Sequence, residues 1–439
     1  MTQVLHEWVS RQADVRPDAA AVVAPGECLT YGRLDAMSNQ LARALKDAGC
    51  KKGDRVCLLM PGSPTATLAV LGILKADGIV VPLDPASPAT RLAEVCDSCE
   101  PRVVLATARL APVLDELFDV PGRGASTAVG WLDPDRSAAP TSGAHFSLAE
   151  VQSYPSTRPA YGNTRPDAAE ILFTSGSTGR PRGVVITHAN VIHLVEWALR
   201  YFVRSTSDRI SGHSSLHVDR STFELFGAFA AGAQLHVVPP EVQRSPRRLA
   251  AVVRTSGLTE WLCVPSTLDD LAGRDAVRPG DFPALKRIVW YGEGLPTPTL
   301  AYWMTRLPHV TFTRLYGRTE ATIASSAYTV PEIPDDPNAE IPIGTECDGE
   351  ELLVLNDRLE PVPFGEVGDL YIRGVGVSSG YWRDPDGTAT AFLPRPRARD
   401  AADRLYKTGD LARVGEDDGL VYCLGRQRPA PEMPEAVNA

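Results

Sequence analysis

Several features that would assign the chain to other classes of protein are missing from its 439 residues. The first residues show no basic segment followed by an apolar stretch, which predicts no secretory signal peptide and a cytoplasmic protein. The most apolar window, residues 66–83, contains Lys75 and Asp77 and is too interrupted to span a bilayer. A net charge of -10 offers no basic face to nucleic acid. We therefore expect neither a membrane nor a nucleic acid as a partner.

Motifs for metal binding and hydrolysis are also missing. Of eight scattered cysteines only Cys96 and Cys99 form a C-x-x-C pair, without the second pair or the histidines of a zinc site, so reduced thiols are expected. His213 and His217 are four residues apart in a strand-to-loop stretch, which does not favour a metal pair. The sequence has no G-x-S-x-G elbow and so no anchor for a hydrolase triad.

The first part of the chain alternates strand and helix patterns instead. Apolar strand patterns at residues 20–23, 55–60 and 78–83 alternate with helical patterns at 31–45, where Thr30 is a candidate N-cap, and at 64–75. This spacing predicts a parallel, doubly wound α/β layer. Residues 121–165 are rich in Gly, Ala, Ser, Pro and Thr, which predicts a surface loop or a junction between subdomains.

A second run of the same kind begins near Ala168. Its strand patterns are at residues 170–174, 209–211, 234–238, 261–264, 287–290 and 310–315. After about residue 335 the pattern changes to short strands punctuated by Gly and Pro. We predict an α/β fold of two doubly wound α/β subdomains packed together, residues 1–164 and 165–335, plus a small, barrel-like β-rich subdomain, residues 336–426, and a short tail, residues 427–439.

A loop rich in glycines and hydroxyls follows the apolar run at residues 171–173. It reads Thr174-Ser-Gly-Ser-Thr-Gly-Arg-Pro-Arg-Gly183. Glycines let backbone N–H groups approach an anion, hydroxyls donate hydrogen bonds, and Arg180 and Arg182 add positive charge. The loop is not a Walker loop, because Pro181 stands where the second glycine should be. A polyphosphate site and a flexible polar turn both remain open, and the two arginines favour the former.

This string resembles the signature loop of adenylate-forming enzymes, which include acyl-CoA synthetases, luciferases and the adenylation domains of nonribosomal peptide synthetases. The family usually has lysines where this chain has Arg180 and Arg182. Other stretches are similar to the family's motifs and follow in the same order: LTYGRL at 29–34, LKADGIVVPLD at 74–84, YGEGL at 291–295, YGRTE at 316–320, GDLYIRG to GYW at 368–382, YKTGD at 406–410 and GR at 425–426.

The resemblance implies a reaction in which a carboxylate attacks the α-phosphate of ATP and gives an acyl-adenylate and pyrophosphate. It implies catalytic roles for four residues: Thr174, Arg182, Thr319 and Glu320. Glu320 is also the implied magnesium ligand, since a carboxylate is a suitable hard donor for Mg²⁺. The implied nucleotide contacts are Thr174, Ser175, Gly176, Ser177, Thr178, Gly179, Arg180, Gly292, Glu293, Gly294, Tyr316, Thr319, Asp410 and Arg426. Of these, Asp410 and Arg426 would contact the ribose and Tyr316 the adenine.

Adenylation domains of peptide synthetases resemble the chain most, because Asp219 matches the aspartate that pairs with a substrate ammonium group. By the same resemblance the pocket is lined by Arg220, Phe223, Cys263, Val289, Tyr291, Leu315, Ile323 and Ala324. Arg220 is unusual, and three interpretations stay open. It pairs with Asp219, it receives an acidic or polar substrate side chain, or it turns to solvent.

The resemblance thus implies an enzyme that activates an amino acid for transfer to a phosphopantetheine carrier protein in nonribosomal peptide or other secondary-metabolite synthesis. An acid–CoA ligase and a nucleotide-binding protein with little turnover are the alternatives. Two residues depart from the pattern near the nucleotide: Arg318 replaces the usual Pro, and Arg314 a common Asn. The lid domain that carries the family's catalytic lysine has no counterpart after Arg426, so we expect slow turnover by this chain alone.

Overall fold

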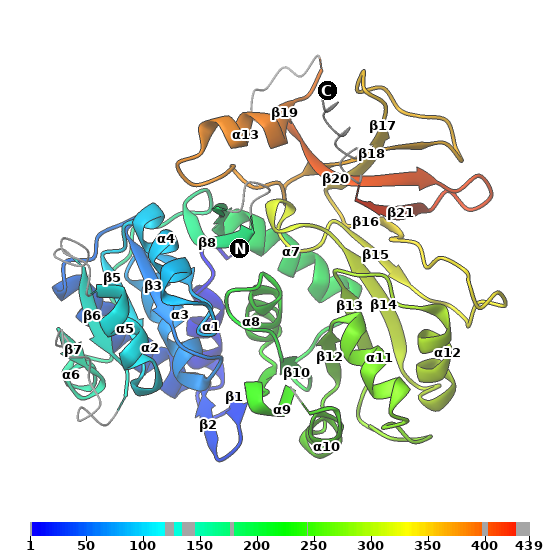
Figure 1. Cartoon of the computed structure of the whole chain (residues 1–439). Coiled ribbons are helices and arrows are strands. Elements are labelled where there is room, and N and C mark those ends of the chain that lie inside the picture. The colour runs from blue at the N-terminus through cyan, green and yellow to red at the C-terminus, as the bar shows by residue number, and fades with distance from the viewer. Residues whose placement is uncertain are drawn as a thin grey trace, which may run out of the picture.

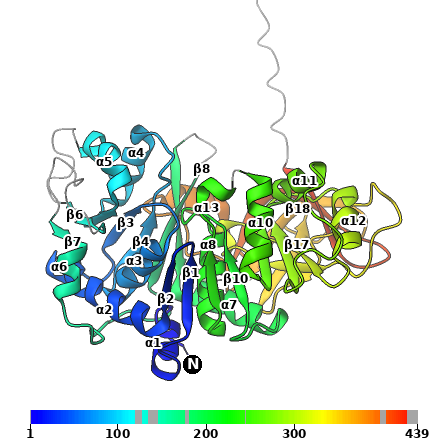
Figure 2. The ribbon, with the colours of Figure 1, turned by 90° about the horizontal axis from the view of Figure 1, so that it is seen from below.

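The computed structural model describes residues 2–118, 127–133, 145–175, 180–243, 245–396 and 403–426. Two large sheets with their helices form two lobes, and a third, smaller sheet lies across one end of them (Figure 1). Seen from below, the lobes lie side by side, with the N-terminal strands where they meet (Figure 2). None of the helices in the described ranges is both long enough and apolar enough to cross a membrane.

The first lobe is built on a seven-stranded sheet in the order β7-β6-β5-β3-β4-β8-β9. Its strands are parallel except β9, which forms an antiparallel hairpin with β8. They are β3 (Arg55–Leu59), β4 (Ile79–Pro82), β5 (Val103–Ala106), β6 (Ala128–Trp131), β7 (Phe146–Ser147), β8 (Ala168–Ser175) and β9 (Pro181–Thr187). The helices of this lobe are α2 (Tyr31–Asp47), α3 (Pro64–Lys75), α4 (Ala89–Cys99), α5 (Ala111–Phe118) and α6 (Leu148–Ser153).

Both faces of this sheet are covered, as β3 illustrates. Val56 and Leu58 belong to the core shared with α2 and α3, whereas Cys57 and Leu59 belong to the core shared with α4 and α5. Successive side chains of a strand point to opposite faces, so a strand covered on both faces is apolar throughout. The doubly wound layer predicted from the apolar runs is therefore confirmed.

The second lobe is built on a nine-stranded sheet in the order β16-β15-β14-β13-β12-β10-β11-β1-β2. Its strands are β1 (Ala20–Ala24), β2 (Glu27–Thr30), β10 (Arg209–Gly212), β11 (Gln234–Val237), β12 (Glu260–Cys263), β13 (Arg287–Tyr291), β14 (Thr311–Tyr316), β15 (Ser326–Thr329) and β16 (Thr345–Glu346). The accompanying helices are α1 (Glu7–Val15), α7 (His188–Tyr201), α8 (Arg220–Ala231), α9 (Pro240–Gln243), α10 (Pro246–Ser256), α11 (Pro265–Gly273) and α12 (Thr297–Arg306).

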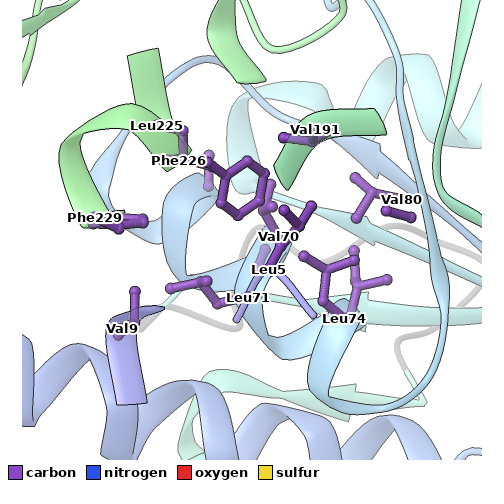
Figure 3. Packing of buried hydrophobic residues seen from close by; sticks show 14 of the residues in the cluster. Leu5, Val9, Val70, Leu71, Leu74, Val80, Val191, Leu225, Phe226 and Phe229 are labelled. Carbon is purple, nitrogen blue, oxygen red and sulfur yellow. The ribbon is translucent and has the colours of Figure 1, made fainter. Parts of the chain in front are cut away.

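One hydrophobic core lies between the two large sheets and is filled by helices of both lobes. Leu71 and Leu74 of α3 pack there with Phe226 and Phe229 of α8 and with Leu5 near the N-terminus (Figure 3). All five side chains are completely buried. Each contributes about 1.5–3 kcal/mol by leaving water, so this layer fixes the two sheets relative to each other.

The third sheet is antiparallel and contains β17 (Glu350–Leu355), β18 (Val367–Gly374), β19 (Phe392–Pro394), β20 (Arg404–Val414) and β21 (Val421–Arg426). Helix α13 (Pro385–Ala391) leads into β19. The hydrophobic core of the third sheet is separate from the cores of the two lobes and includes Leu370, Ile372 and Tyr406. The predicted α/β fold with an additional β-rich unit is confirmed.

The sheets do not follow the chain in simple order. Strands β1 and β2 join the second sheet, whereas β8 and β9, which come after residue 164, join the first. The subdomain limits at residues 164 and 335 therefore stay a prediction, and the predicted tail at 427–439 lies outside the described residues. The loop expected at 121–165 is partly wrong: β6 adds a parallel strand to β5, and Ser147 starts α6 with a capping box.

The eight cysteines are free thiols, as expected for reduced cysteines. Cys57, Cys96 and Cys99 lie together in the core of the first lobe, where Cys57 Sγ is 3.7 Å from Cys99 Sγ. Hydrogen bonding with Cys96 and Cys99, together with burial, holds the pKa of Cys57 well above its usual range, so its thiol stays protonated and unreactive.

Candidate active site

The carboxyl ends of β13 and β14 point toward the third sheet. An open cavity of about 930 Å³ lies between these strand ends and the third sheet. In an open parallel sheet, such ends are where ligands bind. Six of the predicted nucleotide residues line this cavity: Gly292, Glu293, Gly294, Tyr316, Asp410 and Arg426. Arg314 and Arg318 line it as well. The structure therefore brings together residues that are up to 134 positions apart in the sequence.

Asp410 is the most enclosed charge in this cavity, with a side chain only 2 % exposed. Tyr316 donates its hydroxyl hydrogen to Asp410 Oδ2 at 2.6 Å, and Arg318 Nη2 contacts both carboxylate oxygens. In β20 and β21, Arg426 stands directly opposite Asp410. Burial and the neighbouring carboxylate hold the pKa of Tyr316 well above its usual range, so it remains a donor.

The turn after β14 depends on a glycine. A Cβ on Gly317 would lie 2.3 Å from the backbone oxygen of Ile323, so no larger residue fits there. The chain folds back because Thr322 and Ile323 have φ values of 52° and 74°, which β-branched residues rarely adopt. The Thr322 hydroxyl donates to Gly376 O at 2.6 Å and holds this turn. Strain of this kind is typical of functional sites.

Three consecutive residues of this turn reach three different parts of the site. Arg318 contacts Asp410, Thr319 donates its hydroxyl hydrogen to Asp219 Oδ2 at 2.8 Å, and Glu320 accepts from Tyr381 at 2.9 Å. Asp219 lies just before α8, and burial raises the pKa of its carboxyl. The side chains predicted for ribose, ammonium and metal are therefore linked by one tripeptide.

Glu320 lies beside two tyrosines of the third sheet region. Tyr381 donates to its Oε1, and burial together with this carboxylate raises the pKa of Tyr381 and of Tyr406. No cluster of three or more His, Cys, Asp or Glu side chains that could hold a metal occurs in the described ranges. His213 and His217 therefore belong to no such cluster there. A single carboxylate fits a cation that takes its other ligands from phosphates.

The hairpin of β8 and β9 carries the predicted phosphate loop. Thr174 and Arg182 are register partners in it, whereas Gly176, Ser177, Thr178 and Gly179 lie outside the described residues. The Arg182 guanidinium lies 5.3 Å from the ring centre of Tyr381, and its Nε is 3.6 Å from Asp384 Oδ2. Arg180 is exposed, and Ser175 ends β8.

Backbone hydrogen bonds fix this hairpin to the third sheet region. The Val185 N–H donates to Gly380 O at 3.0 Å, and the Trp382 N–H donates to Gly183 O at 2.7 Å. Ser378 adds a hydroxyl bond to Val185 O at 2.8 Å. The base of the loop is therefore held close to Tyr381 and Glu320.

The predicted substrate residues gather under the same turn. Most of them belong to one buried cluster: Phe223, Val289, Tyr291, Leu315, Ile323 and Ala324. Cys263 and Arg220 instead line a second cavity, of about 340 Å³, next to this cluster. The guanidinium of Arg220 lies 4.9 Å from the ring centre of Tyr291. Arg220 is half-buried with its guanidinium against Tyr291, and the described contacts include no ion pair between Arg220 and Asp219.

Sequence reasoning missed several contacts of the site. It gave no role to Tyr381 and Tyr406, although both lie in stretches that resemble family motifs. It noted Arg318 only as an extra charge, whereas the structure pairs it with Asp410. A substitution of the usual Pro by an arginine was the signal that could have indicated this pair.

Comparison with known proteins agrees with this geometry. The family described as "AMP-binding enzyme" matches residues 9–382. The chain is similar to tyrocidine synthase 3 of Brevibacillus parabrevis, with 33% identity over 96% of the chain and 6% of the relative. It is also similar to syringomycin synthase SyrB1 of Pseudomonas syringae pv. syringae, with 32% identity over 96% of the chain and 64% of the relative.

Solved structures of the nonribosomal peptide synthetase FmoA3 are similar throughout the chain. The alpha-methyl-L-serine-AMP bound form has a TM-score of 0.85 and 30% identity, over 97% of this chain and 45% of that one. The AMPPNP bound form also has a TM-score of 0.85, with 29% identity over 96% of this chain and 42% of that one. The chain thus spans less than two thirds of the length of these relatives.

Proposed function

The chain belongs to the AMP-binding enzyme family, and we propose that it activates an amino acid as an aminoacyl-adenylate. The peptide synthetases among its relatives, and a neighbour bound to alpha-methyl-L-serine-AMP, support this choice over an acid–CoA ligase. Asp219 supports it too, because an acid without an ammonium group brings no cation to this buried carboxylate.

A single observation carries the proposal: the tripeptide Arg318–Glu320 contacts Asp410 and Asp219 and also provides a carboxylate beside Tyr381. An amino acid held by Asp219 and a nucleoside held at Asp410 would then meet over Thr319. Holding two reactants in a fixed orientation removes most of the entropic cost of their encounter.

In the proposed reaction, a carboxylate oxygen of the amino acid forms a bond to the α-phosphorus of ATP. The bond between this phosphorus and the bridging oxygen to the β-phosphate breaks, and pyrophosphate leaves with the electron pair. Negative charge is present on all the phosphates throughout, so cationic and hydrogen-bonding groups carry the catalysis. We assign this role to Arg182 and to the hydroxyls of Thr174 and Thr319.

We propose ATP as the nucleotide, with Gly292, Glu293, Gly294, Tyr316, Asp410 and Arg426 around its nucleoside and residues 174–180 around its phosphates. The AMPPNP bound neighbour supports this choice. Glu320 would hold a Mg²⁺ ion, which when bound supplies positive charge to the phosphate oxygens. Tyr381 positions Glu320 by a hydrogen bond to one carboxylate oxygen.

An exchange of labelled pyrophosphate into ATP with a panel of amino acids tests the proposed function directly. We expect exchange that depends on one or a few amino acids and falls by about tenfold or more in Asp219→Asn. Binding of ATP without exchange for any amino acid, even at high protein concentration, would contradict the proposal. It would favour a nucleotide-binding protein with little turnover instead.

We propose a phosphopantetheine carrier protein as the acceptor, because the relatives are peptide synthetases. Loading of a labelled amino acid onto a carrier domain, compared with a carrier whose phosphopantetheine serine is replaced, tests this step. Equal labelling of free coenzyme A and of the carrier would instead indicate an acid–CoA ligase.

A further inference from the structure

The cavity of about 340 Å³ beside α8 has a wall with one cation and several neutral polar groups. Its volume lies at the lower end of the range for small-molecule sites, about 300–1,000 Å³. The polar side chains that line it are His213, Ser214, Ser215, Arg220, Gln243 and Thr267. Apolar residues, among them Leu262 and Val264, form the remainder.

Arg220 has no carboxylate partner among the described residues. Its buried Nε–H has no hydrogen-bond acceptor, and its guanidinium lies 4.9 Å from the ring centre of Tyr291. A completely buried arginine of the same chain, Arg204, instead donates to Glu260 at 3.0 Å in an ion pair. Arg220 as a whole is only half-buried, so a guanidinium without a carboxylate partner in this cavity wall has donors free to bind a ligand.

The carboxyl groups nearest to Arg220 already have other partners. Asp219 accepts from Thr319, and Glu224 accepts from the backbone and the hydroxyl of Ser214 at 3.0 and 3.1 Å. Burial raises the pKa of Glu224 to about 8, which keeps it largely uncharged at neutral pH. Burial lowers the pKa of His213 to about 4, so this imidazole is also neutral. Among the described residues that line the cavity, Arg220 is therefore the one charged side chain, although it still attracts the adjacent carboxylate of Asp219.

We propose that this cavity receives a carboxylate on the side chain of the substrate, so that the activated amino acid is an acidic one. Asp219 and Arg220 are consecutive, and they offer opposite charges to the two ends of such a molecule: the α-ammonium group and the side-chain carboxylate. An arginine suits this task because its planar fork matches a carboxylate. The inference rests on the proposed function and adds the class of substrate.

Aminoacyl-sulfamoyl adenosines, which mimic aminoacyl-adenylates without reacting, provide the test. Binding of the aspartyl and glutamyl compounds is compared with that of the asparaginyl and glutaminyl compounds, their uncharged isosteres, by calorimetry. Because a charge-assisted hydrogen bond is worth roughly 1.5–3 kcal/mol, we expect one acidic compound to bind about tenfold to a hundredfold more tightly than its amide.

Variants then assign the preference to Arg220. In Arg220→Met the acidic compound should lose this advantage while the amide keeps its affinity, and Arg220→Lys should retain part of it. Arg200→Met, which removes an exposed arginine of α7 paired with exposed Asp348, is the control and should change neither. Thermal unfolding of each variant shows that the fold is intact, and unsubstituted sulfamoyl adenosine reports the nucleoside site.

The outcomes separate the two proposals. Binding of amides and acids with equal affinity overturns the acidic substrate but leaves amino-acid activation in place. An acid preference that persists in Arg220→Met overturns the assignment to this residue. If sulfamoyl adenosine binds and no aminoacyl compound binds better, the proposed function itself fails. Loss of the preference in Arg220→Met alone supports the inference.

Discussion

Two arginines of the active site contrast sharply. Arg318, in the larger cavity, is closed: it contacts both oxygens of a carboxylate that is almost completely buried. Arg220, in the smaller cavity, is open: it stacks on Tyr291 and has no ion pair among the described residues. A closed arginine has to be displaced or shared when a ligand binds, whereas an open one gains its first partner from the ligand.

The contrast has a consequence for the nucleotide. A carboxylate accepts about four hydrogen bonds, and Asp410 already receives one from Tyr316 and two contacts from Arg318. If Asp410 binds both hydroxyls of a ribose, as we propose, Arg318 has to give up one of its two contacts with this carboxylate. Arg318 therefore has two opposite effects. Its pair with Asp410 stabilises the protein without ligand, and the same pair weakens the binding of a ribose to Asp410.

Replacing Arg318 breaks the closed pair and has the largest expected effect. Arg318→Met should lower the free energy of unfolding by about 2–3 kcal/mol, because Asp410 becomes a buried charge without a cation. The figure is below that for a fully buried pair, since the Arg318 side chain is 26 % exposed. In the same variant, adenosine should bind more tightly, because Asp410 regains its free acceptor sites.

Urea unfolding and calorimetry with adenosine measure the two effects separately, and adenosine avoids any change in attraction for phosphates. Arg373→Met is the control, since it removes an arginine from more exposed ion pairs with Asp403 and Glu351 in the same sheet and should lower the free energy of unfolding much less. Weaker adenosine binding by Arg318→Met would show that Arg318 positions Asp410 for the ribose rather than competing with it.

Removing the charge of Asp219 tests the proposed amino-acid site, which includes Arg220. Asp219→Asn keeps the shape and an oxygen that can accept from Thr319, but it removes the negative charge that we propose pairs with the ammonium group. We expect the affinity for the aminoacyl-sulfamoyl adenosine to fall by about tenfold to a hundredfold, with adenosine binding unchanged. Asp348→Asn, at an exposed aspartate of the second lobe, is the control. An equal loss for adenosine would mean that the substitution disturbs the nucleotide cavity.

Short-range signals made much of this structure predictable. Pro64 to Lys75 is a helix with the predicted ends, because Ser63 caps it and the pattern is apolar throughout. Thr30 caps α2 as predicted, and its hydroxyl accepts from the Arg33 N–H. By contrast, β6 is only four residues long within a stretch rich in turn formers, and its place in the sheet depends on β5, which lies more than twenty residues earlier.

The site shows the same limit. The motif residues Glu320 and Asp410 could be selected from the sequence, but the pair of Arg318 with Asp410 joins positions 92 apart, which no local pattern indicates. The sequence left three interpretations of Arg220, and its approach to Tyr291, which lies 71 positions later, is a contact that no local pattern indicates. Strand β9 was missed because Pro181 and Gly183 indicate a turn, although a proline is tolerated at the start of a strand.

Glu320→Gln tests whether ATP binding in the larger cavity, which contains Arg318, also depends on a metal. If Glu320 holds Mg²⁺, ATP affinity measured with Mg²⁺ should fall by about tenfold, and affinity measured with a chelator should not change. Tyr381 can still donate to the amide oxygen, so the loss reports charge rather than position. Glu366→Gln, at an exposed glutamate, should behave like the unaltered protein. Equal affinities with and without Mg²⁺ in both proteins would remove the metal role.

The smallest expected effect concerns Glu224, which in its neutral state provides no counter-ion for Arg220. Its native pKa of about 8 lies above the value of about 4.3 for an unfolded glutamate, so the native state binds the proton more tightly. This contribution is complete below the unfolded pKa and is lost as the pH rises through the native one. Between pH 6 and 8 the free energy of unfolding of the unaltered protein should therefore fall by on the order of 1–2 kcal/mol, whereas that of Glu224→Gln should not show this fall.

Urea unfolding at both pH values measures this difference, with Glu332→Gln, at an exposed glutamate, as the control. The groups around Glu224 are Ser214, His213, Arg220 and Cys263, and of these only Arg220 is charged in this range. Once ionised, Glu224 becomes a counter-ion for Arg220 inside the protein. The preference for an acidic substrate should then weaken above pH 8 in the unaltered protein and persist in Glu224→Gln. A preference that falls equally in both would place the titrating group elsewhere.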